Sequence, residues 1–333
     1  MRRGSRIRRT RWKSSCRRSR LVLNQMSNYP NRGLHRFACL VAFATFILIV
    51  AGASVTSHRA GLAVPDWPTT YGEFMFSFPM SKWVGNIFYE HGHRLIASTV
   101  GILTIILAIW LVRVEPRCWV RCLGIAALAV VIAQGVLGGL TVKFMLPPSI
   151  SIAHASLAEA FFCITVTLAF VTSGRWMQPL AAAEAPNGRL VQRLALVSTA
   201  TVYAQIILGA VIRHAESGLV LHILGAIAVI GCVIASMFLV LFTVKQRGFL
   251  RHTILLLCLV TAQIAMGLAT MMVRVPKNAE EQLSAVQTFV PTAHLALGAL
   301  ILATSLGMTL KTYRFLAASG EEAALPFAAG AIS

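Results

Sequence analysis

The chain has 333 residues, of which 57% are hydrophobic and only 12% are charged, whereas typical soluble domains carry about 25% charged residues. Its formal net charge of +19 would suit a nucleic-acid-binding protein, but residues 1–25 hold nine arginines, one lysine and no acid. Much of the excess charge therefore lies in one short segment, and the remaining sequence is strongly apolar. These features exclude a soluble globular protein and argue against a nucleic-acid partner.

Eight apolar segments follow the basic N-terminal stretch. Each is long enough to cross a bilayer as an α-helix, which takes about 20 residues. Only helices and closed barrels can span lipid, because every backbone polar group must be satisfied within the protein. The segments are too long and too continuously apolar for barrel strands, so the sequence predicts an all-α polytopic membrane protein. In chain order they are residues 34–57, 91–113, 119–142, 150–172, 192–213, 218–244, 252–273 and 289–311.

Lysine and arginine gather in alternate connections between these segments. Positive residues favour the cytoplasmic side of a membrane. We therefore expect a multi-pass protein of the cell membrane with both termini in the cytoplasm. Residues 1–33 are expected to form a basic, disordered cytoplasmic arm, unless translation starts at Met26. The connections expected on the outer side are residues 58–90, 143–149, 214–217 and 274–288.

The sequence repeats itself. "AQGVLGGLTVK" (133–143) resembles "AQIAMGLATMMVR" (262–274), and "GASVTSHRAGL" (52–62) resembles "GAVIRHAESGL" (209–219). These matches predict two four-helix bundles of parallel topology, the first of which has an enlarged outer loop at 58–90. The predicted units are a first half at 34–173, a cytoplasmic linker at 174–191, a second half at 192–314 and a cytoplasmic tail at 315–333.

Four histidines lie near the outer ends of the even-numbered segments: His93, His154, His222 and His294. Ionisable side chains inside a membrane are costly and usually mark a site. A lone histidine there is more often a helix–helix hydrogen bonder, but four at repeat-related positions favour ligands. Facing histidines in a four-helix bundle can hold haem or a metal. Each half offers two imidazoles, and no Cys or Asp completes a tetrahedral set, so haem is favoured over zinc.

Glu90 lies one helical turn from His93 on the same face. It could transfer protons there or form a metal site with His93, or it could be a solvated acid at a helix start. His58 and His214 lie at near-equivalent outer ends, where they could contact haem propionates, relay protons or make interfacial hydrogen bonds. His91 points about 160° away from His93 on an ideal helix, so we expect it to be exposed.

The sequence resembles the haem A synthase family of bacteria and mitochondria over nearly all of residues 33–314. In combination with the repeat, the matching stretches are highly specific. They are "GLAVPDWP" (61–68), "YEHGHR" (89–94), "IAHASLAE" (152–159), "LVLHILGA" (219–226) and "TAHLALGAL" (292–300).

This resemblance implies an oxidoreductase that converts the C8 methyl group of haem O to the formyl group of haem A, for cytochrome oxidase. It places the essential glutamate at Glu90 and the haem O ligands at His93 and His154. It places the axial ligands of a resident haem b at His222 and His294. The enlarged outer loop would then be a lid over the substrate half.

The resemblance has one departure and leaves some partners open. Many relatives carry a cysteine pair in the first outer loop, whereas position 64 is Val here and the loop has no cysteine. A thiol route for electrons through that loop is therefore not expected. The partners implied are haem O, the lipid bilayer, a haem O synthase, an unidentified electron acceptor and a further copy of the chain.

Two other functions remain open from the residues. A two-haem cytochrome that only passes electrons, for example from quinol, would carry the same four histidines. A haem transporter would need a route across the membrane rather than ligands at one depth. Glu90 and the enlarged loop favour the synthase over the cytochrome, because electron relay alone needs neither.

Overall fold

A computed structural model of the protein describes residues 31–178, 183–185, 187–244, 246–273 and 283–318. These residues contain eight helices that are long and apolar enough to cross a membrane, as predicted. The predicted basic arm, apart from its last residues, and most of the C-terminal tail lie outside the described residues. The long helices are α2 (Arg32–Ser57), α3 (Asn86–Val114), α4 (Cys118–Lys143), α5 (Pro148–Val171), α7 (Gly188–Ala215), α8 (Leu219–Thr243), α9 (Arg247–Met272) and α10 (Ala285–Phe315).

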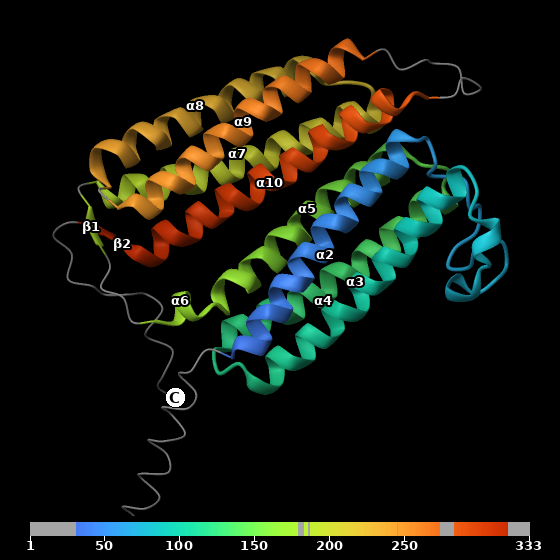
Figure 1. The fold of residues 1–333 in the computed structure, drawn as a ribbon, viewed down its shortest axis with the longest axis horizontal. Coiled ribbons are helices and arrows are strands. Elements are labelled where there is room, and N and C mark those ends of the chain that lie inside the picture. Colours follow the sequence, from blue (N-terminus) through green and yellow to red (C-terminus); the bar gives the residue numbers. More distant parts are fainter. Residues whose placement is uncertain (1–30, 179–182, 186, 245, 274–282, 319–333) are drawn as a thin grey trace, which may run out of the picture.

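The eight helices pack as two groups of four consecutive spans (Figure 1). In the first group, α2 and α4 each contact α3 and α5; in the second, α7 and α9 each contact α8 and α10. The groups meet where α10 contacts α2 and α5, and where α5 contacts α7. This arrangement agrees with the predicted fold class. The boundaries assigned to the two halves, the linker and the tail remain predictions.

Large apolar side chains are exposed along the helices, for example Phe43, Ile132 and Phe242, which are 63%, 59% and 78% exposed. A contiguous apolar surface of this kind is rare on a soluble monomer. These side chains are suited to contact with lipid chains. The exposed apolar surface and the length of the helices therefore both indicate a multi-pass membrane protein.

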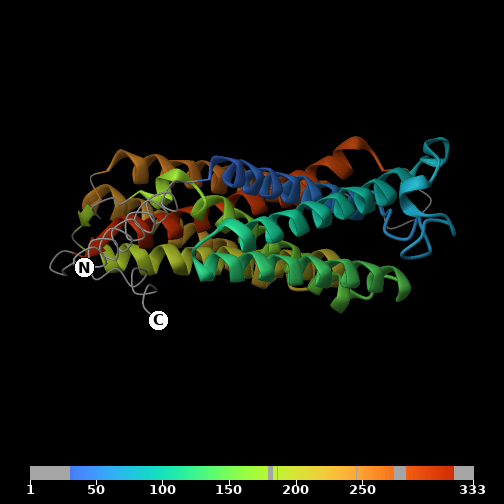
Figure 2. The same ribbon diagram turned by 90° about the horizontal axis from the view of Figure 1, so that it is seen from below.

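The first outer loop is shorter than predicted. It ends at Gly85, whose φ of 55° suits a residue without a Cβ atom, and α3 then begins at Asn86 rather than near residue 91. Glu90 and His91 are therefore inside the helix. Two short 3₁₀ turns, Met75–Ser77 and Met80–Lys82, lie in the loop, which projects past the helix ends in both views (Figures 1 and 2).

Helix α10 also begins earlier than predicted. Ser284 and Gln287 form a capping box, in which each side chain bonds the backbone of the other, and this satisfies two backbone N–H groups at the helix start. Pro291 lies inside the helix and cannot donate to the carbonyl of Gln287. The apolar pattern alone predicts too short a helix, because polar residues cap its first turn and carry no apolar signal.

Two three-residue strands depart from the all-helical pattern. Strand β1 (Ala183–Ala185) pairs in parallel with β2 (Leu316–Ala318), so part of the predicted linker contacts the start of the predicted tail. Gln192 of α7 supports the contact by donating to the carbonyl of Leu316 at 3.0 Å. The pairing joins the two ends of the second helix group on the side predicted to be cytoplasmic.

The orientation in the membrane remains a prediction, and topology reporters can test it. Fusions after residue 80 should report the outer side and fusions after residue 182 the cytoplasm, because lysine and arginine gather in the loops between α3 and α4 and between α5 and α7. Paired alkaline phosphatase and green fluorescent protein fusions would measure this. A cytoplasmic signal at residue 80 would contradict the orientation.

Candidate functional site

Each of the four predicted ligand histidines lies against a glycine of the preceding long helix. A Cβ atom added to any of these glycines would lie 3.0–3.3 Å from the Cε1 atom of the facing imidazole, closer than ordinary van der Waals contacts. Glycine therefore lets each ring approach a helix backbone. The same arrangement occurs in both halves, so the sequence repeat extends to these contacts. The pairs are Gly52–His93, Gly138–His154, Gly209–His222 and Gly267–His294.

The second-half histidines face each other at a distance that suits a shared metal ion. The ring centroids of His222 and His294 are 6.4 Å apart, with an interplanar angle of 63°. Two imidazoles that bind one metal from opposite sides, through bonds of about 2.0–2.1 Å, have centroids roughly 6.3 Å apart. The two rings therefore fit a haem iron held between them.

His222 is held by Gln205 of α7. The Nε2 atom of Gln205 donates to the backbone carbonyl of His222 at 2.8 Å and lies 3.1 Å from its Nδ1 atom. The repeat places Leu48 at the equivalent position of the first half. His93 therefore lacks this restraint, whereas His154, the other first-half histidine, has a comparable one: Gln134 Nε2 donates to its backbone carbonyl at 3.0 Å.

The first-half histidines are close enough for their charges to interact. The buried Nδ1 atoms of His93, His154 and His294 have no hydrogen-bond partner in the described parts of the chain. Buried polar atoms are nearly always satisfied, so these imidazoles suit ligands rather than packing residues. No group of three or more His, Cys, Asp or Glu side chains is placed to hold a bare metal ion among the described residues.

Glu90 is buried rather than a solvated acid at a helix start: its side chain is only 5% exposed. One carboxylate oxygen accepts from Nη2 of Arg94 at 2.6 Å, and the other accepts from the backbone N–H of Val64 at 2.8 Å. Arg94 in turn donates to the carbonyls of Val64, Asp66 and Thr69 at 3.0, 2.7 and 3.1 Å. The Glu90–Arg94 pair thus fastens the outer loop to α3.

The outer loop also packs on the other helices of the first half. The Trp67 ring lies against Gly139 of α4, where an added Cβ would come within 2.5–2.8 Å of the ring. The ammonium of Lys143 lies 6.0 Å from the centre of the same ring. At the far side of the loop, Gly61 contacts Leu146. The loop therefore covers the outer end of the half that contains His93.

The expectation that His91 is exposed is wrong, because it is 0% exposed. The ring packs on Phe78 and Trp83, with centroids 5.0 and 4.7 Å away, and its Nδ1 atom lies 3.1 Å from the hydroxyl of Thr70. His91 does point away from the ligand face. The outer loop folds over that side of α3, however, and sequence periodicity does not reveal such a contact.

Asp66 organises a turn in the loop: its carboxylate accepts from Thr69 Oγ1 at 2.5 Å and from the backbone N–H groups of Tyr71 and Gly72 at 2.7 and 2.8 Å. Burial raises the pKa of Asp66, but these hydrogen bonds outweigh it and lower the pKa below its ordinary value of 3.8. A carboxyl with a lowered pKa stabilises the folded loop above that ordinary value, and this stabilisation is lost as the pH falls through the lowered pKa.

The amides of Tyr71 and Gly72 should therefore lose protection from hydrogen exchange as the pH falls below 3.8 and Asp66 takes up a proton. Exchange measured above and below this pH on the protein and on the Asp66→Ala variant would test the effect, since the variant also corrects for the intrinsic pH dependence of exchange. We expect the variant to lack this protection at every pH. Equal protection in both proteins would contradict the role of Asp66.

The two secondary histidines have different surroundings. His58 stacks on Tyr89, with ring centroids 3.7 Å apart, and its Nδ1 atom lies 2.8 Å from the carbonyl of Ser54; this favours the interfacial role. His214 lies in the last turn of α7 and is half-buried. Its role as a propionate contact or proton relay remains a prediction.

Some residues of the site were not identified from the sequence. Arg94 lies within "YEHGHR", but nothing in the sequence indicates which carbonyls it binds. Glu159 is only 3% exposed, and its Oε2 atom has no hydrogen-bond partner among the described residues. An acid in the middle of an apolar run was a signal that could have identified Glu159.

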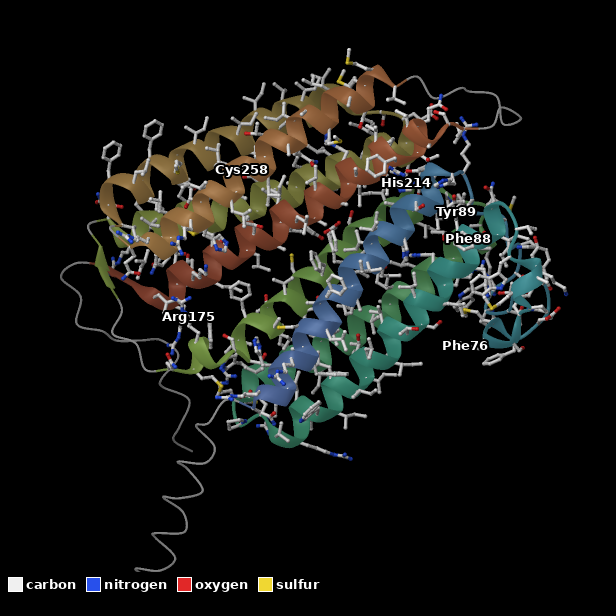
Figure 3. The ribbon with its side chains drawn as sticks, in the orientation of Figure 1. Phe76, Phe88, Tyr89, Arg175, His214 and Cys258 are labelled. Atoms are coloured by element: carbon white, nitrogen blue, oxygen red, sulfur yellow. The ribbon has the colours of Figure 1, made fainter. Side chains whose placement is uncertain are left out.

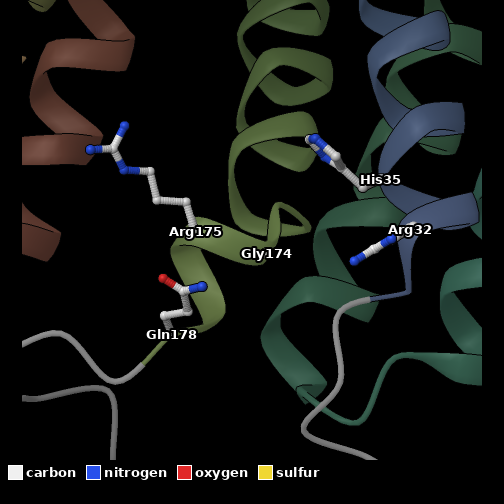
Figure 4. A pocket seen from close by; sticks show the side chains of 5 residues that line it. All are labelled: Arg32, His35, Gly174, Arg175 and Gln178. Atoms are coloured by element: carbon white, nitrogen blue, oxygen red, sulfur yellow. The ribbon is translucent and has the colours of Figure 1, made fainter.

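One cavity lies far from these histidines. It has a volume of about 500 Å³ and is lined by Arg32, His35, Gly174, Arg175 and Gln178, from α2 and the short helix α6 (Gly174–Met177) (Figure 4). Arg175 and His214 lie at opposite ends of the molecule (Figure 3). The cavity is therefore separate from the candidate site.

Known proteins match the part of the sequence that contains most of this site. The family model COX15-CtaA, described as cytochrome oxidase assembly protein, matches residues 77–223, a range that includes Glu90, His93, His154 and His222. Proteins named heme A synthase also match. The chain is therefore similar to haem A synthases over part of its length. The resemblance recognised in the sequence is therefore confirmed.

The curated relatives of this family match only part of the chain. The heme A synthase of Shouchella clausii is 27% identical over 194 residues, which cover 57% of this chain and 62% of that protein. The heme A synthase of Nitrosospira multiformis is 32% identical over 145 residues, covering 41% of this chain and 40% of the relative. The matched segments thus span less than two thirds of these relatives.

Proposed function

We propose that the chain oxidises the C8 methyl group of haem O to a formyl group, giving haem A for cytochrome oxidase. One observation carries the proposal: two matched histidine pairs occur, and among the residues that the structure describes only the first lies in a half covered by a loop fastened through Glu90 and Arg94. Electron relay alone needs no such asymmetry. The names of the matching relatives support the same conclusion.

In this proposal the second half holds a resident haem b. His222 and His294 would be its axial ligands, because their rings face each other at a suitable distance and Gln205 restrains His222. A bound haem supplies one-electron transfer. The Gln205 contact and the glycine at each imidazole would keep the rings in position for the iron.

The first half would hold haem O between His93 and His154. Haem O carries a long isoprenoid tail, so a site between helices is accessible to it from the lipid. Oxidation of the methyl group to the aldehyde removes four electrons, two in each of two successive hydroxylations. In this proposal water supplies the oxygen, the unidentified electron acceptor takes the electrons, and the geminal diol then loses water to give the aldehyde. The loop at residues 58–85 would exclude bulk water from the reacting edge.

Glu90 is proposed to hold or transfer a proton during this oxidation. Both of its oxygens are engaged, with Arg94 and with the Val64 backbone, so proton transfer requires one of these contacts to open. The contact to Val64 connects such an opening to movement of the loop. Glu90 would therefore couple loop position to proton transfer.

The function can be tested in a strain that lacks its own haem A synthase and makes haem O. Expression of this chain should produce haem A, measured by chromatography of extracted haems. Purified protein that contains only haem b, with no haem A formed in cells, would instead indicate the electron-relay cytochrome. Haem bound well below one per chain, with no product, would indicate a haem transporter.

The glycines allow the two halves to be tested separately. Gly209→Val should displace His222 and weaken haem b binding about 10–100-fold, because overpacking typically costs about 1–3 kcal/mol. Gly52→Val should displace His93, leave haem b bound and lower haem A formation. Absorption spectra of purified protein and haem extraction measure the two effects.

Two other glycines on the same helices as the histidines serve as controls. Gly101 of α3 and Gly231 of α8 have no other atom within 4 Å of an added Cβ, so Gly101→Val and Gly231→Val carry the same change in helix propensity without the contact. They should keep haem b and haem A formation. Loss of haem b from Gly52→Val and Gly209→Val alike would contradict separate sites.

A further inference from the structure

Arg213, near the outer end of α7, bridges the two halves. Its Nη2 atom donates to the backbone carbonyl of Ala53 at 2.9 Å and to the hydroxyl of Ser57 at 2.7 Å, both in α2. The Ser57 hydroxyl is itself 2.8 Å from that of Thr292 in α10. The repeat places a threonine, Thr56, at the position equivalent to Arg213, so the first half has no counterpart of this charge.

One donor of this arginine is unused. The Nε atom of Arg213 is buried and has no hydrogen-bond partner in the described parts of the chain. A guanidinium carries its charge on several N–H groups in a rigid planar arrangement, and a buried unsatisfied donor on such a group is costly. An acceptor with negative charge is therefore the partner that this position suits.

The position of Arg213 identifies the partner's chemical class. Arg213 donates to the hydroxyl of Ser57, which lies 2.8 Å from that of Thr292, and Thr292 lies two residues before His294 in α10. A haem has two carboxylates at one edge, and charge-assisted hydrogen bonds between arginine and carboxylate are among the strongest in proteins. Among the buried acids of the described residues, Glu90 pairs with Arg94 and Glu115 with Arg117, and Glu159 lies in the middle of α5, away from the outer helix ends.

We propose that Arg213 binds a propionate carboxylate of the haem held by His222 and His294, while it holds α2 of the first half. This inference rests on the proposed haem b site. The α2 carbonyl that it binds belongs to Ala53, next to Gly52, whose missing side chain accommodates His93. Arg213 thus connects the carboxylate of the resident haem to the backbone that positions a substrate ligand.

The test uses full-length purified protein with haem b bound and needs no haem O. Arg213→Gln should release haem b about 10–100-fold more readily, as expected for loss of a hydrogen bond between charged groups. It should also lower the midpoint potential of the haem, because a nearby cation disfavours the more positive ferric state. Redox-difference infrared spectra should show a shifted propionate carboxylate band.

Arg213→Lys should keep the potential near that of the unchanged protein but lose part of the haem retention, since it keeps the charge and loses the Nε donor.

Two further variants separate direct contact from helix packing. Ser57→Ala removes a contact of Nη2 but leaves Nε, so the potential and the carboxylate band should not change. Arg193→Gln removes an exposed cation from the same helix and should change neither property. If Ser57→Ala shifts the potential as much as Arg213→Gln, the effect comes from packing and the inference is overturned. Unchanged retention, potential and band in Arg213→Gln, in protein that binds haem b, would also overturn it without affecting the proposed synthase function.

Discussion

Glu90→Gln is expected to lower haem A formation by about 10²–10⁴-fold, the usual contribution of general acid–base catalysis, while haem b stays bound in the other half. Glutamine keeps one acceptor oxygen, which can take the Val64 N–H, but it loses the ion pair with Arg94, so loop stability is measured alongside activity. Haem O or a hydroxylated intermediate should accumulate. Chromatography of haems from cells that make haem O but have no other haem A synthase would measure it.

Arg94→Gln is the matched comparison. It breaks the buried ion pair and removes the donors to three loop carbonyls, and loss of one partner of a buried pair costs about 3–5 kcal/mol. Limited proteolysis of the loop should therefore accelerate more in Arg94→Gln, which loses the ion pair and the donors to three loop carbonyls, than in Glu90→Gln, which loses the ion pair alone. If both variants lose activity only in proportion to loop cleavage, Glu90 is a structural anchor and takes no part in proton transfer. Normal haem A from Glu90→Gln would lead to the same conclusion.

His222→Ala and His294→Ala are each expected to abolish the low-spin haem b spectrum. Loss of one of two axial ligands leaves the iron five-coordinate and high-spin, and the remaining imidazole holds the haem less tightly. Absorption and electron paramagnetic resonance spectra of the purified variants would show the change.

His93→Ala and His154→Ala are the controls, since they remove the repeat-related ligands of the first half. Both should keep the low-spin haem b spectrum and lose haem A formation. A haem b spectrum that survives in both His222→Ala and His294→Ala would mean that the resident and substrate halves have been assigned the wrong way round.

The spans and the four ligand candidates could be predicted from the sequence, because a bilayer requires long apolar helices and makes each polar exception informative. The glycine at each histidine is also present in the sequence, as the repeated "GA" of residues 52–53 and 209–210 and the repeated glycines of the third helix in each half. Periodicity, however, does not reveal which ring approaches a given glycine.

The loop could not be predicted in the same way. The burial of His91 and the three carbonyl contacts of Arg94 depend on how residues 58–85 fold back on α3. Such contacts join residues 8 to 30 positions apart, beyond the reach of helical spacing rules. The helix starts at Asn86 and Ala285 were missed for a simpler reason: polar or capping residues begin both helices, where an apolar pattern has no signal.

The parallel repeat has an electrical consequence. His93, His154, His222 and His294 all lie near the N-terminal ends of helices that run in the same direction, so the two pairs are at similar depth in the bilayer. A charge that crosses a membrane does work of about 2.3 kcal/mol per 100 mV. If haems occupy both pairs as proposed, an electron that passes from one pair to the other would move along the plane of the membrane and cross almost none of that voltage. Exchange between the two halves would then be electrically silent in an energised cell.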